Sequence, residues 1–306
     1  MKKPSTLTLF SSLICIVILF LSSFSTSNKH YYGEELSSTH LKSFKDGNVT
    51  INTLKESYSD VGHSIWLKRG GTKEAKAVYF SEGDVYGKLN KWKRGKELVL
   101  TCSGAFSDDL YKTNGALPVG LNVENGYIKN RTVVKEGMDG LVIVYATGGI
   151  VVSDLTKGDL FLQSLGKKVN VRKDVSAKYD LLKWAEDEKA TIFQTQLLAY
   201  DNQLKIGYEG RKQKRERRFL SLAKTSSGTL YHIIFNFPSG EYLYDGAKKV
   251  MEHLNDKGMN VIALLNLDTG AYNVMDLNTG DYSIDSRVKG STRVSDAVNL
   301  LSYHYD

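Results

Sequence analysis

Short apolar runs separated by glycine and polar residues are the feature that most constrains the fold of this chain. Such runs are typical of β-strands, because strands are short and glycine or asparagine commonly forms the turns between them. They occur at residues 64–67, 77–80, 98–102, 141–145, 150–152, 193–200, 219–222, 231–237 and 261–265. Alternating apolar residues on both sides of Asn125-Gly126 also predict a tight hairpin over residues 118–128.

Two segments carry the periodicity of amphipathic helices instead. Residues 179–190 and 245–257 each place apolar side chains on one face and charges on the other, and Gly258 is suited to end the second helix. Strands with a few inserted helices predict an α+β fold: mixed, mainly antiparallel sheets with packed helices in a single domain. The chain of 306 residues is long enough for a substantial core.

The N-terminus has the pattern of an export signal. Lys2 and Lys3 precede a largely apolar stretch over residues 7–24, which small polar residues follow at positions 25–27. This pattern predicts a cleaved signal peptide over residues 1–27, and an uncleaved membrane anchor is the alternative. A polar segment over residues 28–60 is expected to be a linker, and residues 61–306 the domain. The predicted location is therefore outside the cytoplasm: periplasmic, membrane-anchored or extracellular.

Composition argues against several classes of function. The net charge is +7, but six of the basic residues fall between Arg211 and Arg218, so the excess is local and predicts no nucleic-acid binding. The two cysteines and six histidines have no metal-ligand spacing, and phosphate-loop and dinucleotide fingerprints are absent from the sequence. We expect no metal and no cofactor. The oligomeric state is open.

A few polar residues stand out, each with two interpretations. Asp268 follows the apolar run 261–265 closely and precedes Thr269-Gly270, so it is either a turn residue or a carboxylate facing a pocket. Arg218, or its neighbour Arg217, ends the basic run, which is either a solvated loop or the source of an inward-facing phosphate ligand. Cys102 lies in an apolar run and is typical of an inert buried thiol.

The order of several motifs gives a more specific prediction. They are LTCSGAF (residues 100–106), PVGLNVENG (118–126), FQTQLL (193–198), RRFLSLA (217–223) and NVIALLNLDTGAYNVM (260–275). In this order the chain resembles the phosphodiester glycosidase family, that of the lysosomal uncovering enzyme and its bacterial relatives. The resemblance covers residues 65–283, nearly all of the chain that follows the leader.

The resemblance implies a hydrolase that cleaves sugar-1-phosphate diesters of envelope or extracellular glycans. Its substrate would be a phosphorylated glycan or glycoconjugate. It implies catalytic roles for Asp268 and Asn266 and phosphate binding by Arg218 or Arg217 and by Gln194. The residues expected to line the pocket are Cys102, Gly120, Thr269 and Gly270.

Departures from the family pattern leave an alternative open. Cys102 stands where the bacterial branch usually has an asparagine, and Gln196-Leu197 replaces a Gly-Pro pair. After Asp268, Thr269-Gly270 replaces a glycine pair, and Tyr272 would narrow the pocket. The alternative is a catalytically inactive exported domain that binds anionic glycans or an envelope protein.

The N-terminal pattern makes a direct prediction. The protein isolated from its native host should have a mass that corresponds to a chain beginning near Asn28, and it should lie outside the cytoplasm. A full-length chain in the soluble cytoplasmic fraction would contradict export.

Overall fold

The structure is a computed structural model of the chain, and it describes residues 35–70, 73–108, 116–158, 160–162, 167–208 and 213–306. The predicted signal segment over residues 1–27 and the first residues of the expected linker therefore lie outside the described residues. Within the described ranges, no helix is long and apolar enough to cross a membrane.

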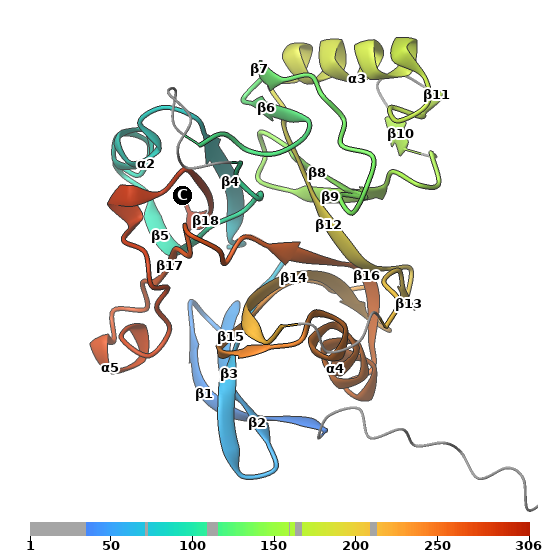
Figure 1. Ribbon diagram of the computed structural model, residues 1–306. Helices are drawn as coiled ribbons and strands as arrows, with labels where there is room; N and C mark the ends of the chain where they lie inside the picture. The colour runs from blue at the N-terminus through green and yellow to red at the C-terminus, as the bar shows by residue number, and fades with distance from the viewer. Residues whose placement is uncertain (1–34, 71–72, 109–115, 159, 163–166, 209–212) are drawn as a thin grey trace, which may run out of the picture. The chain divides into compact units, whose positions relative to one another are not determined.

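One large sheet forms most of the fold (Figure 1). Its strands are β1 (Leu36–Phe44), β2 (Val49–Glu56), β3 (Ser59–Lys68), β6 (Asn122–Glu124), β7 (Tyr127–Asn130), β8 (Gly140–Val144), β9 (Ile150–Asp154), β12 (Thr191–Tyr200), β13 (Gln203–Leu204), β14 (Arg215–Thr225), β15 (Leu230–Glu241) and β16 (Met259–Leu267). They follow the order β1-β2-β3-β15-β14-β16-β12-β6-β7, and β8, β9 and β13 extend from the β12 region.

A second sheet has the strand order β17-β5-β18-β4. It contains β4 (Lys76–Ser81), β5 (Glu97–Cys102), β17 (Met275–Leu277) and β18 (Asn299–Tyr305), and a separate pair joins β10 (Leu160–Leu162) to β11 (Lys167–Val169). The helical elements among the described residues are α2 (Val85–Trp92), α3 (Val175–Asp187), α4 (Leu243–Asp256), the short α5 (Tyr282–Asp285) and the 3₁₀ turn η2 (Val294–Asp296).

The prediction of an α+β class is wrong. Strands hold 46% of the described residues and helices 17%, so the fold is β-rich. The named strands pair antiparallel throughout. Helices connect strands that are not neighbours in a sheet: α4 joins β15 to β16, which both pair with β14, and α2 joins β4 to β5, which both pair with β18. The two main helices cover parts of a sheet instead of building a layer of their own (Figure 1).

The two helical segments are nevertheless where the apolar periodicity puts them. Residues 179–190 overlap α3, and residues 245–257 overlap α4. The α3 helix begins earlier than predicted, because Asp174 caps it by accepting hydrogen bonds from the backbone N–H groups of Ser176 and Ala177. The predicted hairpin is also confirmed, since Asn125 and Gly126 have φ angles of 49° and 81° between β6 and β7.

The core lies on both faces of the large sheet. On one face Leu220 and Leu265 belong to a buried cluster with Tyr79 and Leu301 of the second sheet, so the two sheets share this core. On the other face Phe219 packs in a separate cluster with α4. Strand residues alternate between faces, which explains why neighbours in β14 belong to different clusters.

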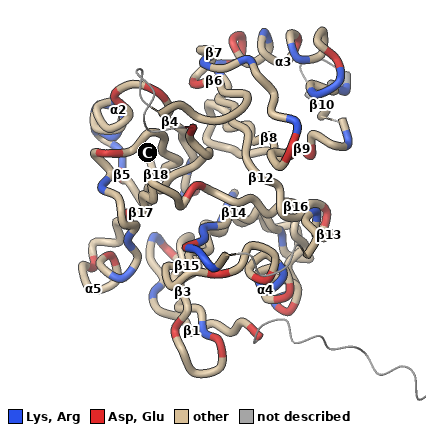
Figure 2. The backbone as a smooth tube through the Cα atoms, in the orientation of Figure 1, with Lys and Arg blue, Asp and Glu red and all other residues tan. Residues whose placement is uncertain are grey.

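Lys and Arg positions are spread over both sheets and the helices (Figure 2).

The segment expected to be a linker forms strands from Leu36 onward. Within residues 28–60 the structure has β1, β2 and the start of β3, and β3 joins this hairpin to β15. Many side chains of β1 are exposed, so its sequence reads as polar, while Ile51 and Leu54 of β2 are fully buried. A strand with one solvated face has too few apolar residues to be recognised by composition.

Leu54 gives a test of this part of the fold. Replacing it (Leu54→Ala) should lower the free energy of unfolding by about 2–5 kcal/mol, because the side chain is fully buried. The control Thr39→Ala changes an exposed residue of β1 and should cost within about 0.5 kcal/mol. Denaturant unfolding measures both, and equal small effects would show that this segment is a linker.

Candidate functional site

Asp268 lies immediately after β16, where the large sheet meets the second sheet. Its backbone N–H donates to the carbonyl of Gly104, 3.1 Å away, just beyond the end of β5. Its carboxylate Oδ1 accepts a hydrogen bond of 2.8 Å from the backbone N–H of Gly270. The residue is only 6% exposed. Asp268 is thus both a turn residue, as one interpretation expected, and a buried carboxyl at the junction of two sheets.

Burial is the main influence on this carboxyl. It raises the pKa of Asp268, and the backbone N–H groups of Gly270 and Ser107 and the positive charge of Arg218 oppose the shift only in part. Burial also raises the pKa of the Tyr79 and Tyr272 hydroxyls, and the charge of Asp268 adds to both shifts. Two neutral phenols therefore lie within electrostatic reach of a carboxyl that is less acidic than an ordinary aspartate.

Arg218 is the buried cation of this region. It is 1% exposed, and its guanidinium donates to the Val274 carbonyl at 2.7 Å, to Asn273 Oδ1 at 2.8 Å and to Asn236 Oδ1 at 3.1 Å. Asn236 is the cross-strand partner of Arg218 in β15, whereas Asn273 and Val274 belong to the segment leading into the second sheet. Arg218 thereby fixes the chain that follows Asp268, and its Nε has no partner among the described residues.

Asn266, predicted to be catalytic, lies on the other face of the sheet. Its neighbours Leu265 and Leu267 belong to the core shared by the two sheets, so the Asn266 side chain points the opposite way. There Asn266 Nδ2 donates to Gln196 Oε1 at 2.9 Å. The structure does not bring Asn266 together with Arg218.

Gln194 is engaged by the backbone of a neighbouring loop. Its Oε1 accepts hydrogen bonds of 3.1 Å from the N–H groups of Leu121 and Val134, and its Nε2 donates to the carbonyls of Val134 and Met138 at 2.7 and 2.6 Å. Both amide hydrogens are used, so Gln194 has no donor left for the phosphate contact that the resemblance implied. A Cβ at Gly120 would come within 2.5 Å of Gln194 Oε1, which explains the glycine there.

Some of the other predicted residues lie near Asp268, whereas Arg217 does not. Cys102 is fully buried, and burial raises the pKa of its thiol to about 11, so it is inert near neutral pH. Thr269 donates its hydroxyl hydrogen to the Glu216 carbonyl at 2.7 Å. Arg217 is half-buried and its Nε donates to the Glu241 carbonyl at 3.2 Å, away from Arg218. Asp268, Arg218, Cys102, Thr269 and Gly270 therefore form one region, which we call the Asp268 centre.

Two further residues of the Asp268 centre were not predicted from the sequence. Ser103 Oγ accepts from the Val274 N–H at 2.9 Å and donates to the Tyr272 carbonyl. Asn299 accepts from the Gly104 N–H at 3.0 Å and donates to the Ala105 carbonyl at 2.9 Å. The only signal in the sequence is a polar residue at the edge of an apolar run, which is common in any strand.

Comparisons with known proteins are limited to structural similarity. No family model and no curated protein matches the sequence. The catalytic domain of zebrafish N-acetylglucosamine-1-phosphodiester alpha-N-acetylglucosaminidase, auto-inhibited by its pro-peptide, has 13% identity and a TM-score of 0.45, and the match covers 90% of this chain and 85% of that domain.

Two bacterial proteins are also similar in structure. A hypothetical protein from Synechocystis has 9% identity and a TM-score of 0.42, over 89% of this chain and 62% of that one. A Burkholderia pseudomallei protein described as exported has 9% identity and a TM-score of 0.38, over 84% and 74%. The similarities concern the course of the backbone alone. No group of three or more His, Cys, Asp or Glu residues in the described ranges is arranged to hold a metal.

The neighbouring arginines give a matched stability test. Replacing Arg218 (Arg218→Ala) removes three hydrogen bonds and leaves buried acceptors unpaired, so it should lower the free energy of unfolding by about 3–5 kcal/mol. Arg217→Ala removes one hydrogen bond of a half-buried side chain and should cost about 1 kcal/mol. Thermal and denaturant unfolding measure the difference, and a smaller loss for Arg218→Ala than for Arg217→Ala would contradict this account.

Proposed function

We propose that the protein is an exported hydrolase that cleaves sugar-1-phosphate diesters, with Asp268 as the residue that acts at the sugar. One observation supports this proposal most: a buried carboxyl with a raised pKa lies at the junction of two sheets, within the field of a buried arginine. Perturbed carboxyls of this kind are over-represented at catalytic sites. Export rests on the charged and apolar N-terminal sequence.

The reaction makes a clear demand on such a carboxyl. The bond between the anomeric carbon and the phosphate oxygen breaks, the phosphate monoester of the acceptor leaves, and water supplies the new hydroxyl of the sugar. Positive charge develops on the sugar ring as the bond breaks. An ionised Asp268 stabilises that charge, attacks the anomeric carbon or deprotonates the water.

Arg218 contributes through its position and its charge. Three of its hydrogen bonds are to protein oxygens, so it acts as a fixed buried cation near the leaving phosphate and not as a bidentate clamp on it. A preorganised charge stabilises the transition state without reorganising during the reaction. Arg218 is therefore a positioning residue for the segment that carries Asp268 and Asn273.

The non-catalytic alternative is favoured by a specific observation. The Gln194 amide hydrogens and both terminal nitrogens of Arg218 already donate to protein oxygens, which leaves only the buried Arg218 Nε without a partner among the described residues. A domain that binds anionic glycans without cleaving them needs no free phosphate ligands at Asp268. Turnover separates the two functions.

Replacing Asp268 by its amide (Asp268→Asn) tests the proposal. The purified protein is incubated with sugar-1-phosphate diesters of several sugars, and release of reducing sugar is followed. The variant should lose turnover by about 10²- to 10⁴-fold, because the amide can neither ionise nor attack. The control Asp276→Asn removes a half-buried carboxylate of β17 and should keep full activity. Unchanged turnover in Asp268→Asn would exclude the catalytic role.

The raised pKa of Asp268 adds a pH dependence with a fixed sign. Turnover that needs the ionised carboxyl should rise with pH through a pKa above the ordinary value of 3.8. Protonation of Asp268 also affects the free energy of unfolding, because the folded state holds this proton more tightly than the unfolded state. The stabilisation from the bound proton is fully present below pH 3.8 and is lost as pH rises through the pKa of the folded state. Asn cannot ionise, so the stability of Asp268→Asn relative to the wild type should increase across that window.

A further inference from the structure

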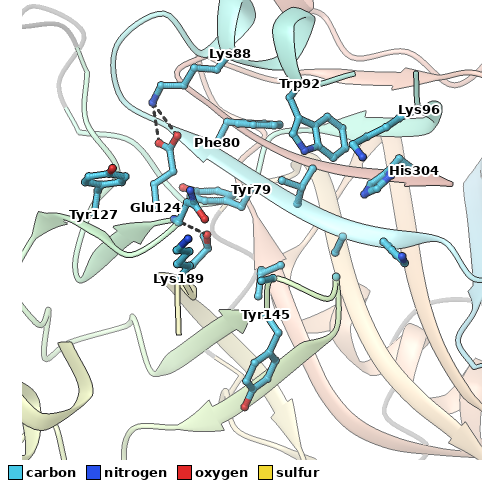
Figure 3. A pocket seen from close by; sticks show the side chains of 18 of the residues that line it. Tyr79, Phe80, Lys88, Trp92, Lys96, Glu124, Tyr127, Tyr145, Lys189 and His304 are labelled. Atoms are coloured by element: carbon cyan, nitrogen blue, oxygen red, sulfur yellow. Dashed lines mark hydrogen bonds and ion pairs between the residues drawn. The ribbon is translucent and has the colours of Figure 1, made fainter. Parts of the chain in front are cut away.

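A large cavity of about 1040 Å³ lies beside β4, and Asp268 is not among its lining residues (Figure 3). Its walls come from β4, α2, the β6–β7 hairpin, the loop after β8 and the C-terminal end of β18. Cavities that hold small molecules are typically up to about 1000 Å³. This one can therefore accept more than a single sugar ring.

The charged side chains of this cavity are mostly lysines. Two acidic residues, Glu124 and Asp306, line it. The lysines that line it are Lys76, Lys88, Lys91, Lys96, Lys129 and Lys189. Lysine acts as a strongly hydrated point charge that binds anionic groups without a fixed bidentate geometry. The cavity is therefore suited to an anionic ligand.

Two of the lysines have their charge available. Lys88 pairs with Glu124 at 2.8 Å, and Lys96 lies 3.5 Å from Asp306. Lys91 and Lys189 are exposed, and neither has an acidic partner in the part of the chain that the structure describes. They come from different elements, α2 and the turn after α3, so the positive charge is distributed over the cavity.

The cavity also offers hydrogen-bond acceptors. His304 is 5% exposed, and burial lowers its pKa, so the ring is neutral near pH 7. Its Nδ1 lies 3.5 Å from Asp306 Oδ1, so this nitrogen faces a carboxylate of the protein. The acceptors in the cavity are the carboxylates of Glu124 and Asp306. Such acceptors suit a ligand that has hydroxyl groups beside its negative groups, because a phosphodiester backbone without hydroxyls has no hydrogen to donate to them.

The aromatic side chains of the cavity differ in how far their ring faces are exposed. Tyr127 is 70% exposed at the rim, so its ring has an open surface. The Trp92 ring is covered by the rings of Phe80 and His304, whose centroids lie 5.5 and 4.4 Å from its own, and by Lys96, whose Nζ lies 5.4 Å from the Trp92 ring centroid (Figure 3). Single-stranded nucleic acids stack successive bases on several open rings. One open tyrosine fits a sugar ring better than a series of bases.

We propose that this cavity binds a segment of an acidic polysaccharide. Lys91 and Lys189 pair with successive negative groups along the saccharide, the carboxylates of Glu124 and Asp306 accept hydrogen bonds from its hydroxyls, and Tyr127 contacts a ring face. The inference goes beyond the proposed hydrolase, because binding here requires no reaction at Asp268, and it gives the non-catalytic alternative, a domain that binds anionic glycans, a definite site. The negative groups of the ligand are carboxylates or phosphates, and the experiment distinguishes them.

Calorimetric titration of the Asp268→Asn variant tests binding without turnover. The probes are oligogalacturonate, which carries carboxylates, a ribitol phosphate oligomer, neutral maltohexaose and a thymidine decanucleotide. One of the two acidic saccharides should bind at least about tenfold more tightly than maltohexaose and the nucleotide. Affinity should fall as salt rises, because exposed lysines supply the attraction.

Matched variants locate the binding. The double variant Lys91→Glu/Lys189→Glu should weaken the acidic saccharide by at least about tenfold. Lys93→Glu/Lys183→Glu changes the net charge equally at exposed positions outside the lining, and its affinity should stay within about twofold. Tyr127→Ala should weaken binding, whereas Tyr58→Ala, at a residue 99% exposed outside the cavity, should not.

Three results would overturn the proposal. They are equal losses in both double variants, tighter binding of the nucleotide than of either saccharide, and no binding of either acidic saccharide at ~1 mM. Loss or retention of turnover at Asp268 is measured separately with the diester substrates, so failure of the hydrolase proposal and failure of this one are distinguishable.

Discussion

The buried guanidinium of Arg218 is the interaction on which the arrangement of the two sheets depends. It joins Asn236 in β15 to Asn273 and Val274, which lie between β16 and the second sheet. A buried cation is tolerated only where its hydrogen bonds are largely satisfied. Its position therefore determines where the segment after Asp268 must run. The apolar core shared by the sheets excludes water from this contact.

The same burial decides the chemistry of Asp268. Removing water from the carboxyl raises its pKa, and the backbone N–H groups of Gly270 and Ser107, followed by the charge of Arg218, offset that shift only in part. The burial of Asp268 is a consequence of how the two sheets pack together. A catalytic role for Asp268 would therefore use a perturbed carboxyl that the fold already produces. The lysine-lined cavity has the opposite character, because its unpaired cations, Lys91 and Lys189, are exposed and attract a ligand through water.

Sequence patterns succeeded where a local rule was sufficient. The amphipathic segments form α3 and α4, Asn125-Gly126 forms the β6–β7 turn, and Asp268 ends a buried strand. Sequence patterns failed where one face of a strand is solvated, as in β1. They also failed where the function of a polar residue depends on the face of the sheet to which its side chain points. Asn266 and Arg218 looked like partners along the chain, yet strand alternation places them on opposite faces of the sheet.

By itself the sequence determined the short strands, the two main helices and the position of Asp268 at the end of an apolar run, because these depend on periodicity and turn chemistry over a few residues. Only the tertiary structure decided that both amide hydrogens of Gln194 bond to a loop backbone and that Arg218 is held by three hydrogen bonds to protein oxygens. It alone also gathered Lys91, Lys189 and His304 around one cavity. Those outcomes depend on hydrogen bonds and burial between segments distant in sequence, and no local pattern encodes them.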